Sequence, residues 1–224
     1  MCTKYQATRM LRRVVLLLEH HFPSTLKDYE HFLRESEYSC SATSRKLCKP
    51  APISDRDTVR LLSTARNIGL QILMPAAFLL LSEASIMQIL EEGSDIRQLS
   101  QTNFVCLLKG QRKLYRIARE EVFVLLYSNP QDLSSLCKTT KNCNSARHDI
   151  IRDHVEVDAF GTLSAFTAIS FDRASAAALC RFCKEVFKSS YTDRQGRAWE
   201  TLPAQFDLPS WEEMRRTRDE LLSS

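Results

Sequence analysis

The sequence has little glycine and few stretches in which apolar and polar residues alternate. Only five of its 224 residues are glycine. Alternation with a period of two residues is the main sign of a half-buried strand, so its scarcity argues against a large sheet. The remaining composition, with 44% hydrophobic and 26% charged residues, is that of an ordinary folded domain. We therefore predict an all-α protein.

The sequence also lacks a hydrophobic run long enough for a membrane span or a secretory signal. The most apolar stretch, residues 72–81, contains Pro75 and has about half the length of a span. Near the N-terminus, the apolar run 14–18 is shorter than a signal-peptide core, and no small-residue cleavage site follows it. We expect an intracellular protein, cytoplasmic or nuclear, in which cysteines remain reduced.

Neither a strong charge of one sign nor a catalytic motif is present. The net charge of +4 is too small by itself to indicate a nucleic-acid-binding protein. No glycine-rich phosphate loop, nucleophile elbow or His-Glu-x-x-His zinc motif occurs. We expect no enzymatic activity, no catalytic residue and no organic cofactor.

The sequence is comparatively rich in cysteine, and four of its eight cysteines form two close pairs. The pairs are Cys137 with Cys143 and Cys180 with Cys183. Four thiolates make a closed tetrahedral zinc site, and the Cys-x-x-Cys half has the usual ligand spacing, whereas the other half is wider. We expect a structural zinc ion at these four residues. Buried, unligated thiols are the main alternative, a disulfide is a lesser one, and His148 or His154 is a candidate replacement for Cys137 or Cys143.

Helical spacing of apolar residues divides the chain into three parts. Residues 1–36 form a predicted helical hairpin, in which Ser24 is a candidate cap for the second helix. Residues 37–53, rich in serine, lysine and proline, form a predicted flexible linker. Residues 54–224 form a predicted helical domain with capping boxes at Ser54 and Ser210, a helix end at Gly69, and a fully buried helix over 70–81.

Several short motifs extend over most of the chain. They are Lys4-Tyr5, Arg12-Arg13, Phe22-Pro23-Ser24-Thr25-Leu26, Leu73-Met74-Pro75-Ala76-Ala77-Phe78, the two cysteine pairs, and the tail motifs from Trp199 to Glu213. Together they resemble the C-terminal part of fungal, basidiomycete-type BTB/POZ-domain-containing proteins. The strands and the dimer-forming first half of a BTB domain would precede the helices seen here, so the resemblance does not extend to homo-oligomerisation.

The resemblance implies a non-enzymatic protein-interaction module, an adaptor or scaffold linked to ubiquitin ligation or to transcription. Its partners would be other proteins. A zinc-stabilised nucleic-acid-binding protein is the alternative, in which basic residues around the cysteines contact phosphate. These residues are Lys138, Lys141, Arg147 and Arg152. The small net charge favours the interaction module.

Overall fold

Every regular element in the described part of the chain is helical, which confirms the predicted all-α class. The structure is a computed structural model, and it describes residues 2–38, 54–82, 95–122, 137, 139–155, 166 and 178–223. No strand occurs among these residues. The chain divides into two compact units, the first made of residues 1–82, 86–110 and 201–224 and the second of residues 83–85 and 111–200.

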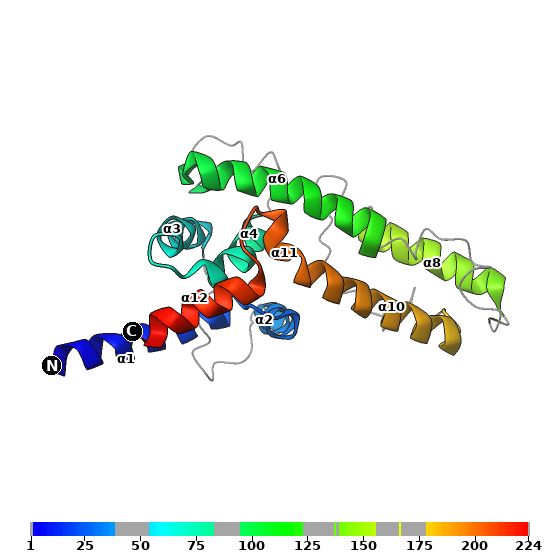
Figure 1. Ribbon diagram of the computed structural model, residues 1–224. Coiled ribbons are helices and arrows are strands. Elements are labelled where there is room, and N and C mark those ends of the chain that lie inside the picture. Colours follow the sequence, from blue (N-terminus) through cyan, green and yellow to red (C-terminus); the bar gives the residue numbers. More distant parts are fainter. Residues whose placement is uncertain are drawn as a thin grey trace. The chain divides into compact units, whose positions relative to one another are not determined.

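The first unit is built around α4 (Met74–Ser82; Figure 1), in which every residue except Leu80 is buried. The 3-10 turn η1 (Gln71–Leu73) leads into it, and Pro75 lies in its first turn, where a missing N–H is harmless. α3 (Asp55–Ala65) packs against it, and the 3-10 turn η2 (Asp95–Gln98) packs against α3. The beginning of α6 (Gln101–Ile117) and α11 (Leu202–Gln205) belong to the same unit. The uniformly apolar stretch was therefore correctly predicted as a core helix.

Phe206, which follows α11, fills the space between α4 and α6. Its ring stacks on Phe78 with the centroids 5.0 Å apart, and it lies directly against Gly110 of α6. Both phenylalanines are almost completely buried. A side chain on Gly110 would overlap the Phe206 ring, so the absence of a Cβ at this position is what permits the contact.

The predicted serine caps are present at both helix starts, and the reciprocal capping box is complete at α12. Before α3, Ser54 Oγ accepts from the Asp57 amide at 3.2 Å and donates to Asp57 Oδ2 at 2.7 Å. Before α12 (Trp211–Ser223), Ser210 Oγ accepts from the Glu213 amide at 3.3 Å, and Glu213 Oε2 accepts from the Ser210 amide at 2.9 Å. The predicted helix end at Gly69 is also confirmed, since this residue has φ +76° just after α3.

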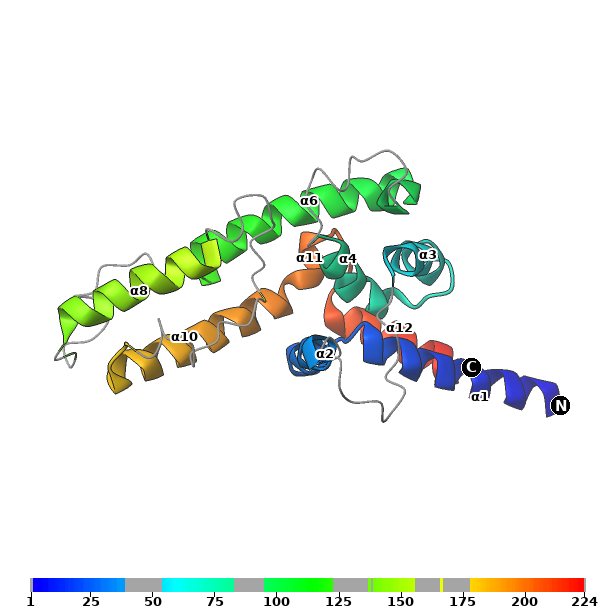
Figure 2. The ribbon, with the colours of Figure 1, turned by 180° about the vertical axis from the view of Figure 1, so that it is seen from behind.

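The N-terminal hairpin of α1 (Cys2–His21) and α2 (Leu26–Tyr38) belongs to the first unit. α1 lies beside α12, to which two polar contacts join it (Figure 2). Arg12 donates to the Leu222 carbonyl at 2.8 Å, and Arg218 pairs with Glu19 at 2.6 Å. The hairpin was expected to be separate from residues 54–224, whereas these contacts group it with α12. The cap of α2 also differs, because Thr25 rather than Ser24 accepts from the Asp28 amide, at 3.2 Å.

The second unit contains the end of α6, the π-helical turn η3 (Ala118–Val122), α8 (Thr140–Val155) and α10 (Arg181–Glu200). α8 and α10 lie side by side and run in the same direction (Figures 1 and 2). Trp199 at the end of α10 is buried and meets Phe166 edge to face, with centroids 5.4 Å apart. The described part of α10 begins at Arg181.

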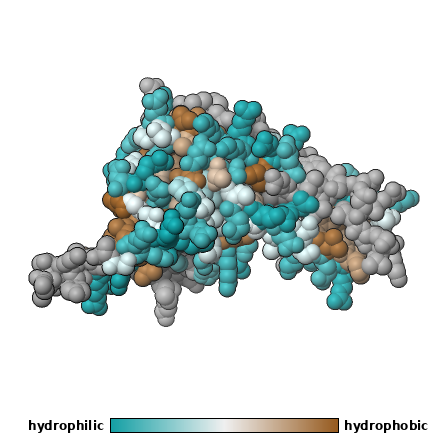
Figure 3. Space-filling view, in the orientation of Figure 1, coloured by the Kyte–Doolittle hydropathy of each residue, from teal (hydrophilic) through white to brown (hydrophobic). Residues whose placement is uncertain are grey.

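None of the described helices combines the length and the apolarity that crossing a membrane would require. In the face of the molecule shown in Figure 3, hydrophilic side chains cover much of the described surface and apolar ones occur in small separate groups. Most of the predicted linker, residues 39–53, lies outside the described residues.

Candidate metal centre

Four cysteines from two chain segments meet at the beginnings of α8 and α10. Cys137 lies just before α8 and Cys143 lies in its first turn. Cys180 directly precedes α10, and Cys183 lies in the first turn of that helix. The structure brings all four predicted ligands together.

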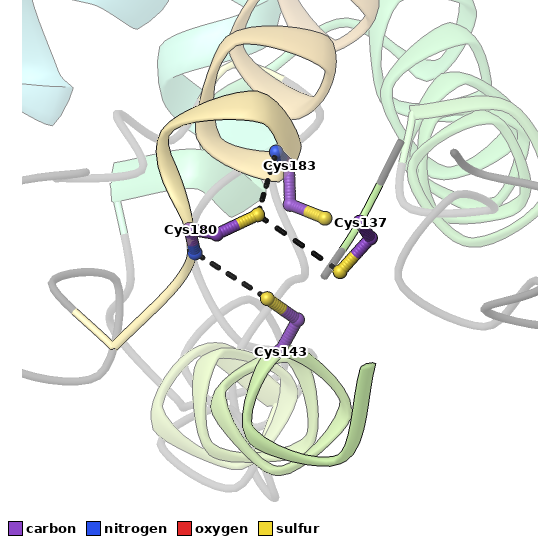
Figure 4. Close-up of side chains that lie close together, drawn as sticks. All are labelled: Cys137, Cys143, Cys180 and Cys183. Atoms are coloured by element: carbon purple, nitrogen blue, oxygen red, sulfur yellow. Dashed lines mark hydrogen bonds between the residues drawn. The ribbon is translucent and has the colours of Figure 1, made fainter. Parts of the chain in front are cut away.

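The four sulfur atoms lie within 4.8 Å of one another and point toward a common centre (Figure 4). Cys180 Sγ and Cys137 Sγ are 3.9 Å apart. Sulfurs bound to one zinc ion at about 2.3 Å stand about 3.8 Å from each other in a tetrahedron. The observed cluster is therefore slightly wider than a loaded zinc site and needs only small movements of side chains to become one.

Backbone N–H groups already stabilise the sulfurs. The amide of Cys180 donates to Cys143 Sγ at 3.3 Å, and the amide of Cys183 donates to Cys180 Sγ at 3.5 Å. Thr139 Oγ1 and Cys143 Sγ share a hydrogen bond of 3.4 Å. Such donors, together with the positive ends of two helix dipoles, favour thiolate over thiol. They also orient the sulfurs, as the second shell of a metal site does.

The thiols of the cluster differ in acidity. The hydrogen bond from the Cys183 amide is the largest of several influences that lower the pKa of Cys180 to about 7. Burial raises the pKa of Cys137 and of Cys183 above the usual value of a thiol. Cys180 thus ionises more readily than Cys137 and Cys183, whose ionisation a nearby cation would favour. A divalent metal supplies that charge.

The burial of the cluster suits a site that is closed to solvent. Cys143 and Cys183 are buried and Cys137 and Cys180 are half-buried, and all four are free thiols. Cys106, also a buried free thiol, lies apart from them in α6. Cys40 and Cys48 lie outside the described residues.

The histidines considered as replacement ligands do not join the cluster in the part of the chain that the structure describes. His148 lies on α8 with its side chain exposed. The side chain of His154 is outside the described residues. Among described residues, the cluster that suits a metal ion consists of cysteines alone.

Arg147, which only the nucleic-acid alternative would use as a phosphate contact, is buried beside the cluster. It is 5% exposed and lies over the ring of Phe187, with its Cζ 5.5 Å from the ring centroid. The signal in the sequence was its spacing, because Arg147 follows Cys143 by four residues and therefore shares its face of α8. Lys141 is exposed, whereas Lys138 and the side chain of Arg152 lie outside the described residues.

Comparisons of the chain with protein-family models, with curated proteins and with solved structures gave no match.

Proposed function

We propose that the chain is a non-enzymatic protein-interaction module, of the adaptor or scaffold kind that the BTB/POZ resemblance implies. We also propose that a structural zinc ion holds its second unit together. The cysteine cluster supports the zinc part of this proposal, and an exposed apolar face of α1 supports the interaction part.

Zinc is the metal that best suits the cluster. Four cysteine sulfurs are soft ligands in a small, roughly tetrahedral arrangement, and zinc binds such sets without redox chemistry. A site with four protein ligands has no position for water or substrate. Its role is therefore structural, to tie the segment before α8 to the beginning of α10. This closure also supports the non-enzymatic part of the proposal.

The observation that carries the interaction role is an unburied apolar stripe on α1. Met10, Val14 and Leu17 are 68%, 48% and 67% exposed, and their spacing of four and three residues places them on one face of the helix. Arg9 and Arg13, both exposed, flank that face. Residues with this spacing are the anchors by which a helix binds in an apolar groove, and the two arginines favour a protein groove with an acidic rim.

The nucleic-acid alternative receives less support from the surroundings of the cysteines. Of the four basic residues that would contact phosphate, Arg147 is buried, and only Lys141 is described as exposed. A buried guanidinium cannot contact a phosphate backbone.

The test compares partner binding by three forms of the full chain. In Met10→Ser/Leu17→Ser the apolar stripe is interrupted. Leu16→Ser is the matched control, since Leu16 is 65% exposed on the same helix but lies away from the stripe. We expect a protein, identified by mass spectrometry and then purified, to bind the wild type and Leu16→Ser with equal affinity and the double variant at least about 10-fold more weakly.

Two results would contradict the proposal. One is a partner whose binding is indifferent to the stripe. The other is retention of nucleic acid with an affinity that falls steeply as salt rises, which is the signature of phosphate contacts.

A further inference from the structure

Arg147 is the only charged residue among the buried residues of the described part of the chain. Taking a guanidinium out of water costs free energy that nearby negative charge or polar groups must offset. Its burial beside the cysteine cluster is not explained by the phosphate contact that the nucleic-acid alternative would give it.

The register of α8 and α10 places Arg147 one helical turn from the sulfurs. Cys143 and Arg147 are four residues apart on α8, and Cys183 and Phe187 are four residues apart on α10. Residues with this spacing lie one above the other on a helix face. Because the Arg147 guanidinium lies over the Phe187 ring, the Arg147–Phe187 layer is stacked directly on the Cys143–Cys183 layer.

Arg147 interacts electrostatically with one of the predicted ligands. Burial lowers the pKa of Arg147, and the attraction of a Cys183 thiolate opposes that effect. The phenyl ring of Phe187 presents a negative face to the cation. The buried charge therefore interacts with both an aromatic ring and a cluster sulfur, in a setting where electrostatic interactions are stronger than in water.

Metal binding changes the net charge of the cysteine cluster beside Arg147. Four protonated thiols are neutral, whereas four thiolates around one divalent ion carry a net charge of about −2 by simple addition. A fixed cation one turn away thus interacts much more favourably with the loaded cluster than with the protonated one. A group that stabilises one of two states shifts the equilibrium toward that state.

We propose that Arg147 is the buried counter-charge of the metal–thiolate cluster, a positioning residue that strengthens metal binding and makes the bound thiolates less reactive. This inference rests on the zinc centre proposed above. Exposed lysines near the cluster do not serve the same purpose, because water and salt screen their charge. Lys141, in the first turn of α8 and exposed, is the nearest comparison.

The experiment measures zinc affinity of the full chain by competition with a chromophoric chelator under reducing conditions. Arg147→Met and Arg147→Gln remove the charge, Arg147→Lys keeps it, and Lys141→Met removes an exposed charge from the same helix. We expect both neutral variants to bind zinc at least about 10-fold more weakly than the wild type, as loss of an outer-shell partner does. Arg147→Lys should recover most of the affinity, and Lys141→Met should match the wild type.

A second readout separates a charge effect from general loosening of the fold. Iodoacetamide alkylates zinc-bound thiolates faster when their negative charge is less compensated, so the zinc-loaded neutral variants should react faster than zinc-loaded Arg147→Lys. Stability of the zinc-free chain, measured by urea unfolding, should differ little between Arg147→Met and Arg147→Lys, because the counter-charge acts only on the loaded cluster.

The outcomes distinguish the two proposals. If the wild type binds no zinc, the zinc centre and this inference both fail. If the wild type binds zinc and the neutral variants bind it equally well, the centre stands and the role of Arg147 is overturned. The inference is also overturned if both neutral variants lose their fold in a way that excess zinc does not restore, because Arg147 would then stabilise the unit independently of the metal.

Discussion

At the scale of single residues, Gly110 shows how closely the first unit is packed. A Cβ at this position would overlap the ring of Phe206. Gly110→Ala should therefore lower the free energy of unfolding by about 1–3 kcal/mol, the usual cost of overpacking, although alanine is the better helix former. Urea unfolding followed by circular dichroism measures this.

Gly196 provides a matched control within α10. A Cβ at Gly196 would meet nothing within 4 Å. Gly196→Ala should then raise the free energy of unfolding by up to about 1 kcal/mol, because only helix propensity changes. Equal effects of the two substitutions would contradict the contact between Phe206 and Gly110.

The burial of Arg147 is a feature of a single residue that the sequence hardly indicates. Its neighbours Ser145, His148 and Asp149 are polar, so the segment reads as a solvated helix face. Burial of Arg147 follows from α10 covering that face. The four-residue spacing from Cys143 places Arg147 on the same face but does not by itself reveal what covers it. The cysteine positions, by contrast, were predictable because ligand spacing at helix starts is a local property.

At the scale of elements, the capping box of α12 makes stability depend on pH. Hydrogen bonds from the Ser210 side chain and amide lower the pKa of Glu213 below the usual glutamate value. A carboxyl whose pKa is lower in the folded state contributes stability above its unfolded pKa and loses that contribution as pH falls through the folded pKa. The wild type should therefore be more stable than Glu213→Gln at neutral pH, and the difference should vanish between about pH 5 and pH 3.

Thermal unfolding of both forms across that pH range tests the sign. Glutamine resembles the protonated carboxyl, so the variant removes the charge and keeps the shape. A difference that grows as the pH falls would contradict the role of the Glu213 charge.

The contact between α1 and α12 depends on the ion pair of Glu19 with Arg218, which is 2.6 Å long with both side chains about one-fifth exposed. A double-mutant cycle with Glu19→Gln and Arg218→Met should give a coupling energy of about 1 kcal/mol, at the upper end for such pairs. The pair of Arg34 with Glu30 is 3.8 Å long and more exposed, so its coupling should be at most about 0.5 kcal/mol. Equal values for the two pairs would mean that α1 is not held to α12 by this contact.

Individual elements were largely predictable, while some of their ends were not. Local patterns in the sequence predict the buried helix α4, the turn at Gly69 and the serine caps of α3 and α12. The extension of α10 through Gly196 to Glu200 does not, because glycine normally argues for a helix end. Thr25 caps α2 although Ser24 has the same chemistry, and only the backbone geometry after Pro23 decides between them.

At the scale of the whole molecule, the grouping of helices into units was the least predictable feature. The sequence separates residues 1–36 from 54–224, whereas one compact unit contains α1, α2, α3, α4 and α12. The contacts responsible, such as Arg12 with Leu222, join residues far apart in the sequence. Such pairs leave no periodic signal in a single chain.

The zinc proposal predicts that the second unit depends on the metal and the first does not. Zinc binding to structural cysteine sites contributes on the order of 10 kcal/mol, comparable to the whole stability of a domain. Chelation of zinc, or Cys180→Ser, should therefore abolish amide hydrogen-exchange protection at the starts of α8 and α10 while that of α4 remains. Cys106→Ser is the control, because Cys106 lies outside the cluster, and it should leave protection of α8 and α10 unchanged. Equal loss in both units, or no loss in either, would contradict this division.

The proposed zinc centre is tested most directly by zinc-edge X-ray absorption of the full chain loaded with one equivalent of zinc under reducing conditions. The proposed centre predicts a first shell of four sulfur atoms at about 2.3 Å. The sulfurs already lie within 4.8 Å of one another, so little rearrangement is required. A shell with two or more nitrogen or oxygen ligands, or failure of the chain to retain one equivalent of zinc, would contradict it.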